Sequence, residues 1–133
     1  MGKVVIDTSV LIGIEKASFP IETFFDSGEQ VLIPTIALAE YLVGRSATTN
    51  PVLPELITQH FESFRTLSQV VEFGEREAKK FAELKAESLR SGKKRTNFDL
   101  AIAAHAVVND AILVTRDKSA RLSELTGVVT REV

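Results

Sequence analysis

The sequence predicts an α/β domain in which a mainly parallel sheet of about five strands is flanked by helices. Short apolar runs, many of them β-branched, alternate along the chain with longer segments of helical composition. This alternation is typical of a parallel sheet with helical crossovers. The chain has 133 residues, of which 44% are hydrophobic. That size suits a single domain, residues 1–133, with a core of its own.

Five short apolar runs have the composition of buried strands. Most contain adjacent β-branched residues, which favour extended backbone. The predicted strands are residues 3–7, 31–33, 70–73, 111–114 and 128–130. Because these runs are contiguous rather than alternating, we expect the strands to be covered on both faces, as in a parallel sheet.

The segments between these strands carry helical composition and boundary signals. After a first helix that follows Thr8 and Ser9, the predicted helices are residues 19–26, 35–43, 55–66, 75–91 and 98–108. Thr8 and Ser9 can cap the first helix, Gly44 suits the end of the third, and Asn97 can cap the last. Residues 46–54 have the most loop-like composition of the chain.

The composition excludes several classes of protein. The chain has no cysteine, which rules out disulfides, thiolate zinc sites and a cysteine nucleophile. We expect a cytoplasmic protein, because no secretory signal precedes Asp7 and no apolar run approaches the ~20 residues that span a bilayer. The net charge is −2 and the pI is near 5.7. Binding to nucleic acid would therefore need local basic patches or bound cations.

Four acidic residues interrupt apolar segments. Asp7 ends the first predicted strand, Asp117 follows the fourth, and Asp99 begins an apolar helix. Glu40 lies within the least polar predicted helix. An ionised carboxylate in apolar surroundings is costly without a partner, and functional groups gather at the carboxyl ends of parallel strands. We therefore expect the four acids to converge and to bind Mg²⁺ or Mn²⁺, which prefer oxygen ligands.

Three of these acids also have a purely structural explanation. Asp7 would serve as a helix cap, Asp99 as a first-turn acid favoured by the helix dipole, and Asp117 as a turn residue. Glu40 has no such local role, because it lies in the middle of an apolar helix. The four positions taken together favour a site.

Hydroxyl and basic residues near the acids are further candidates. The hydroxyls would either orient the acids and their waters or act as caps and turn formers; they are Thr8, Ser9 and Thr115. The basic residues would either bind RNA phosphates or be charged residues of exposed loops; they are Lys93, Lys94, Arg95, Arg116 and Lys118. Neither His60 nor His105 has the context of a catalytic residue.

Around the four acids the sequence resembles the PIN-domain family, in particular the toxin nucleases of VapBC-type toxin–antitoxin modules. The resemblance extends from residue 4 to about residue 130 and rests on four motifs in order. They are residues 5–12 (VIDTSVLI), 34–44 (PTIALAEYLVG), 97–106 (NFDLAIAAHA) and 113–117 (LVTRD). Many relatives continue the fourth motif into an Asp-Phe pair, whereas this chain continues with Lys118 and Ser119.

The resemblance implies a three-layer PIN-like domain and a magnesium- or manganese-dependent endoribonuclease. Asp7, Glu40 and Asp99 would be the core metal ligands, with Asp117 as a further ligand through water. The cation would polarise the scissile phosphate and lower the pKa of the attacking water. The resemblance also implies a homodimer and a small antitoxin partner that blocks the active site, so that a type II toxin inhibits translation or growth until it is neutralised.

Other functions remain open at this point. One is a PIN fold that binds RNA or a protein partner without cutting. A receiver-type signalling domain would need an acid pair early in the chain and an aspartate after the middle strand, and neither Asp7-Thr8 nor residues 70–73 provide them. A phosphatase of the haloacid-dehalogenase type would need a second aspartate at position 9, which is Ser9.

Overall fold

The computed structural model describes residues 2–16, 22, 28–47 and 54–133. In these residues one sheet contains five strands in the order β3-β2-β1-β4-β5, and all four neighbouring pairs are parallel. The strands are β1 (Lys3–Ile6), β2 (Gln30–Pro34), β3 (Gln69–Val71), β4 (Ile112–Thr115) and β5 (Thr130–Glu132). The predicted α/β class with a parallel sheet is confirmed.

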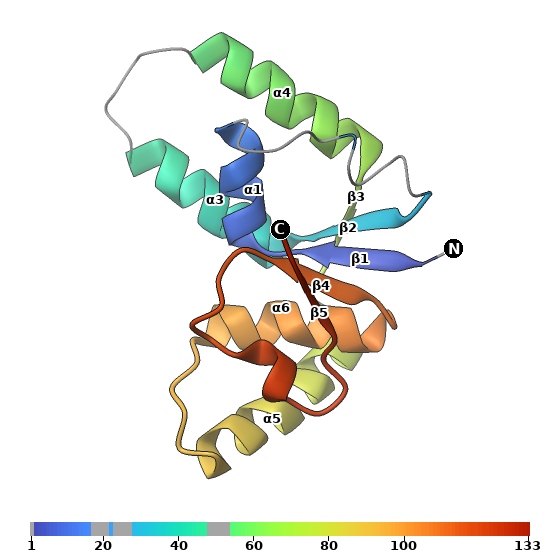
Figure 1. The fold of residues 1–133 in the computed structure, drawn as a ribbon, viewed down its shortest axis with the longest axis vertical. Helices are drawn as coiled ribbons and strands as arrows, with labels where there is room; N and C mark the ends of the chain where they lie inside the picture. Colours follow the sequence, from blue (N-terminus) through green and yellow to red (C-terminus); the bar gives the residue numbers. More distant parts are fainter. Residues whose placement is uncertain (1, 17–21, 23–27, 48–53) are drawn as a thin grey trace.

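Helices cover both faces of the sheet (Figure 1). One layer contains α1 (Thr8–Glu15), α3 (Thr35–Ala47) and α4 (Pro54–Leu67), and α1 packs against the other two. The opposite layer contains α5 (Glu75–Arg90) and α6 (Asn97–Val108), which pack against each other. A short 3-10 helix, η1 (Leu122–Glu124), contacts α6. None of the helices in the described residues is both long and apolar enough to cross a membrane.

Both β1 and α6 lie within the hydrophobic core. Val4, Val5 and Ile6 of β1 are fully buried, as expected for a central strand with helices on both faces. Every residue of α6 from Leu100 to Ala106 is buried as well. A helix that is apolar all round must be enclosed, and α6 lies between the sheet and α5 (Figure 1).

Several predicted boundaries are wrong by a few residues. The helix predicted to stop at Gly44 continues to Ala47, which also shortens the predicted loop 46–54. The cap of α6 is Thr96, whose hydroxyl accepts a hydrogen bond from the backbone of Asp99, whereas Asn97 is the first helical residue. The last strand begins at Thr130 rather than at residue 128.

Two predicted elements fall on residues that are not described. Apart from residue 22, the helix predicted for residues 19–26 lies outside the described residues. The same holds for residues 48–53 of the predicted loop.

The connections bring distant segments to one edge of the sheet. A single residue, Asp7, joins β1 to α1, and β2 continues directly into α3. Only three residues join α6 to the amino end of β4, so α6 runs back across the sheet and begins at the carboxyl edge. The carboxyl ends of β1, β2 and β4 therefore lie at the same edge as the start of α6 (Figure 1).

Candidate functional site

Asp7 is the most enclosed of the four acids, with 7% of its surface exposed. It is the cap of α1, and its carboxylate accepts hydrogen bonds from the backbone of Val10 at 3.2 Å and the hydroxyl of Ser9 at 2.5 Å. Burial raises the pKa of Asp7, and hydrogen bonds from Ser9, Thr115 and Val10 oppose this effect. Asp7 therefore performs the structural role of a cap at a place where ionisation is costly.

Glu40 lies on α3 and is half-buried. Its Oε1 accepts a hydrogen bond of 2.7 Å from the hydroxyl of Thr8. Thr8 follows Asp7 at the start of α1, so this bond holds the Glu40 carboxylate beside the end of β1. The bond spans 32 residues of sequence, and it supplies the partner that an acid in the middle of an apolar helix requires.

Asp99 lies in the first turn of α6 and is half-buried. Burial raises its pKa most, and the negative charges of Asp117, Glu40 and Asp7 raise it further, while the hydroxyl of Thr96 lowers it. Repulsion of this kind requires that each of these three carboxylates lies in the neighbourhood of Asp99. The structure thus brings together four acids from four separate segments of the chain.

Asp117 differs from the other three because it is exposed, on the loop that follows β4. Its Oδ1 accepts hydrogen bonds from the backbone of Ser119 at 2.8 Å and from the Ser119 hydroxyl at 2.6 Å. These two bonds lower the pKa of Asp117. The turn role considered for Asp117 is therefore present, in a loop that also places it near Asp99.

The three hydroxyl residues named from the sequence all contact the acid cluster. Besides the bond from Thr8 to Glu40, the hydroxyl of Ser9 donates to Asp7 and accepts a hydrogen bond of 2.9 Å from the backbone of Arg116. Thr115 forms a side-chain hydrogen bond with Asp7 and accepts one from the backbone of Asp117. Ser9 and Thr115 therefore connect the end of β1 to the end of β4.

The chemistry of this donor set fits a hard divalent cation. Carboxylate oxygens are ligands that Mg²⁺ and Mn²⁺ prefer, and the repulsion acting on Asp99 is the kind of cost that a bound cation offsets. In the described residues, however, no three histidine, aspartate or glutamate side chains already form a group that would hold one ion. Binding would therefore require the carboxylates to move closer together or to bind partly through water.

The basic candidates differ in their exposure and in their ion pairs. Arg95, predicted to lie in an exposed loop and to bind RNA, has a side chain that is 1% exposed, so this prediction is wrong. Lys93 forms an ion pair with Glu124, and Lys118 forms one with Glu132 at 3.0 Å. Lys94 and Arg116 are exposed. They remain candidates for phosphate contacts.

Ser119 is a residue near the site that was not among the sequence candidates. A serine two residues after an aspartate is the spacing at which the carboxylate can accept a hydrogen bond from the following backbone in an Asx turn. That local signal was present in the order Asp117, Lys118, Ser119. The sequence contains no comparable local pattern that would predict the carbonyl partners of Arg95, which lie 25 and 26 residues away.

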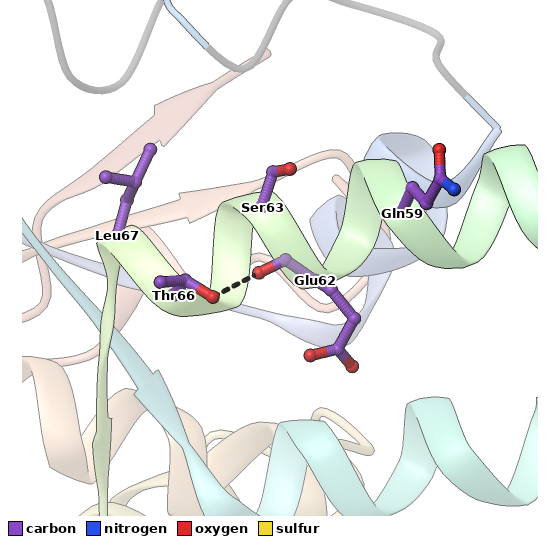
Figure 2. Close-up of a pocket in the computed structure, with 5 residues that line it drawn as sticks. All are labelled: Gln59, Glu62, Ser63, Thr66 and Leu67. Atoms are coloured by element: carbon purple, nitrogen blue, oxygen red, sulfur yellow. Dashed lines mark hydrogen bonds between the residues drawn. The ribbon is translucent and has the colours of Figure 1, made fainter.

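A depression of about 630 Å³ lies along α4 (Figure 2). Its lining residues are Gln59, Glu62, Ser63, Thr66 and Leu67. Inside it, the hydroxyl of Thr66 donates to the backbone carbonyl of Glu62 (Figure 2). None of the four clustered acids lines this depression, and its geometry suggests no chemistry.

Solved structures of other proteins have the same fold as this chain. No curated protein matches the sequence. VapBC2 from Rickettsia felis, solved with a DNA fragment from its promoter, is 20% identical, with a TM-score of 0.84 over 98% of both chains. DNA-bound VapBC from Salmonella typhimurium is 24% identical, with a TM-score of 0.80 over 99% of this chain and 98% of that chain. VapBC-5 from Mycobacterium tuberculosis is 22% identical, with a TM-score of 0.74 over 100% and 98%.

At these identities the likeness to solved structures establishes a shared fold. The family assignment rests on a separate match, because the model that describes the PIN domain matches residues 4–125. That range includes all four clustered acids and most of the chain. The chain therefore belongs to the PIN-domain family.

Proposed function

We propose that this chain is a divalent-cation-dependent endoribonuclease that hydrolyses phosphodiester bonds in RNA. The observation that carries the proposal is the convergence of four acids. The negative charges of Asp7, Glu40 and Asp117 raise the pKa of the fourth, Asp99. A fold that ionises four neighbouring carboxylates without a matching set of cations bears a cost. A bound Mg²⁺ or Mn²⁺ removes that cost and supplies the chemistry.

The side chains would divide the work as follows. Asp7, Glu40 and Asp99 would hold the cation, and Asp117 would bind it through water from its position on an exposed loop. When bound, the cation polarises the scissile phosphate and lowers the pKa of the attacking water. Thr8, Ser9 and Thr115 keep the carboxylates oriented, since each is hydrogen-bonded to one of them or to the backbone beside them. The exposed Lys94 and Arg116 would contact RNA phosphates.

The biological role that we propose is that of the toxin in a type II toxin–antitoxin module. Support comes from the three VapBC structures, which share the fold over nearly the whole of this chain. A small antitoxin would bind the chain and block the acid cluster, and the active form would be a homodimer in the cytoplasm. Inhibition of growth on induced expression, relieved by Asp7→Asn, is the expected cellular result.

RNA cleavage by purified, partner-free protein tests the enzymatic proposal. We expect cleavage with Mg²⁺ or Mn²⁺, none with EDTA, and a loss of more than about a hundredfold in Asp7→Asn. Even loss of a residue that merely orients a metal ligand costs about 10- to 100-fold. Asparagine can still cap α1, so this variant should fold.

Asp110→Asn is the matched control. Asp110 is an exposed aspartate in the turn between α6 and β4, at the opposite edge of the sheet. Its φ of 52° is tolerated by asparagine. Cleavage by this variant should equal that of the wild type. RNA that is bound but left intact under all metal conditions would contradict the nuclease proposal and favour a PIN fold that binds without cutting.

A further inference from the structure

Arg95 is a buried cation in the connection between α5 and α6. Arginine is rarely enclosed without partners, because its guanidinium stays charged in proteins. The side chain of Arg95 is 1% exposed. The other two charged residues of the same connection, Lys93 and Lys94, are exposed. The enclosure of Arg95 therefore requires a structural reason.

The guanidinium of Arg95 binds the segment that follows Asp117. Its Nε donates to the carbonyl of Ala120 at 2.7 Å, and its Nη2 donates to the carbonyl of Arg121 at 3.1 Å. Its Nη1 donates to the hydroxyl of Ser88 on α5 at 3.0 Å. One planar group thus joins the end of α5 to two successive carbonyls, which lie 25 and 26 residues after Arg95 in the sequence.

These contacts join the two segments of the chain that carry Asp99 and Asp117. Arg95 precedes Asp99 by four residues, and Ala120 follows Asp117 by three. η1, which follows Arg121 directly, packs against α6. The path from Arg95 to the Asp117 carboxylate is short, because Ala120 is the neighbour of Ser119, and both the backbone and the hydroxyl of Ser119 hold Asp117 Oδ1.

The backbone of the same loop is strained at its anchor point. Arg121 has a φ of 49° and a ψ of 47°, a left-handed conformation that is uncommon for a residue other than glycine. Such conformations persist when surrounding contacts fix them. The carbonyl of Arg121 is held by Arg95 and by the backbone of Glu124. Arg95 is therefore among the contacts that fix this conformation.

We propose that Arg95 is a positioning residue that sets the place of Asp117 relative to Asp99 and so sets the affinity for the divalent cation. This inference rests on the proposed function. It gives a role to a basic residue that does not lie on the surface and cannot contact RNA directly. Lysine at position 95 would keep the charge but could not reach both carbonyls and Ser88 in one plane.

The test is Mn²⁺ titration of the full-length protein without RNA. We expect R95K to bind Mn²⁺ about tenfold more weakly than the wild type, the lower end of the loss for a residue that orients metal ligands. The same substitution in a D117N background should change the affinity by less than about twofold, because Arg95 acts through Asp117. Arg131→Lys is the matched control, since Arg131 binds Glu29, which precedes β2, through two hydrogen bonds.

A second measurement does not depend on the cation. Hydrogen exchange of the Ser119 amide, which donates to Asp117 Oδ1, should be faster in metal-free R95K than in the wild type or R131K. If R95K does not fold, Ser88→Ala removes the Nη1 partner, together with the hydrogen bond from the Ser88 hydroxyl to the carbonyl of Lys93. It keeps both bonds from Arg95 to the loop carbonyls and should shift both measurements in the same direction by a smaller amount.

The outcomes separate this inference from the proposed function. If R95K binds Mn²⁺ with the affinity of the wild type and its Ser119 amide exchanges at the wild-type rate, the inference is overturned. The proposed function is unaffected by that result. An equal loss of affinity in the D117N background would also overturn it, because the effect would then be a general loss of structure. A wild-type protein that binds no Mn²⁺ would overturn both.

Discussion

Asp99 and Asp117 belong to the same cluster, yet their pKa values are displaced in opposite directions. Asp99 lies on a helix at the edge of the core, where burial and three neighbouring carboxylates raise its pKa. Asp117 lies on an exposed loop, where two hydrogen bonds from Ser119 lower its pKa. The helix-borne part of the site is therefore costly to ionise, whereas the loop-borne part is stabilised in its ionised form.

This difference suggests a division of roles. Under the proposed function, the positions of Asp7 and Asp99 beside the core would fix the cation in place, and the cation would offset their repulsion. The position of Asp117 depends on hydrogen bonds of the loop, so its contribution can be altered without disturbing the core. Each of the following changes breaks or sharpens this comparison.

The largest difference is expected between D99N and D117N in RNA cleavage. Loss of a direct ligand should lower the rate by more than about a hundredfold, whereas loss of a ligand bound through water should lower it by about tenfold. The measurement is the initial rate with saturating Mn²⁺ at neutral pH, with D110N as the control. Equal losses for the two variants would contradict the division of roles.

The stability of the metal-free protein should depend on pH with opposite signs in these two variants. Because the folded-state pKa of Asp99 is raised, its stabilising contribution is full below the unfolded pKa of about 3.9 and is lost as pH rises through the folded value. D99N should therefore be more stable than the wild type at pH 7, because the wild type must ionise Asp99 in a place where its folded-state pKa is raised.

For Asp117 the sign is reversed. Its folded-state pKa is lowered, so its contribution is present above about pH 3.9 and is lost as pH falls through the folded value. D117N should be slightly less stable than the wild type at pH 7, and the difference should vanish in acid. Urea unfolding in EDTA between pH 3 and pH 7 measures both variants, and the same sign for both would refute the comparison.

His105, near the other end of α6, extends the comparison to a basic side chain. It is fully buried, and among the described residues neither ring nitrogen has a hydrogen-bond partner. Burial lowers its pKa, and the negative charge of Glu77 opposes this only in part. His105→Leu should raise the free energy of unfolding by about 1 kcal/mol at pH 7, because it removes buried polar atoms without partners.

The advantage of His105→Leu should grow in acid. Since the folded-state pKa of His105 is lowered, the neutral form is favoured on folding, and wild-type stability falls as pH drops below the unfolded value of about 6.5. Thermal unfolding of both proteins from pH 7.5 to pH 5 provides the measurement. A parallel pH dependence of the two curves would show that His105 is not the group responsible.

The smallest effect is expected for Thr8→Val. This change removes the hydrogen bond of 2.7 Å to Glu40 and preserves the β-branched shape. Mn²⁺ affinity should fall about three- to tenfold, the factor that corresponds to one hydrogen bond. Thr66→Val is the matched control, because its hydroxyl binds a backbone carbonyl on α4 (Figure 2). A similar loss in the control would mean that the effect is not specific to Glu40.

Much of the fold and the four acids could be predicted because their signals are local. An apolar run followed directly by an aspartate marks the end of a buried strand, as at Asp7. Glu40 could be singled out because nothing near it in sequence accounts for a charge within an apolar helix. The parallel sheet followed from contiguous apolar strands separated by helices.

The errors arose where tertiary contacts decide. Gly44 costs an α-helix only about 1 kcal/mol relative to alanine, and α3 continues past it. Thr96 and Asn97 are both good caps, and local composition does not say which one begins the helix. Arg95 was placed on the surface because arginine usually lies there. Two of its partners are backbone carbonyls far along the chain, which residue types do not reveal.

The measurement that tests the central claim most directly is Mn²⁺ binding to the wild type and to four variants that each neutralise one acid: D7N, E40Q, D99N and D117N. If the four carboxylates form one cation site, the wild type binds Mn²⁺, each variant binds it more weakly, with D117N affected least, and D110N binds it as the wild type does. A wild type that binds no Mn²⁺, or variants whose affinity equals that of D110N, would contradict the account.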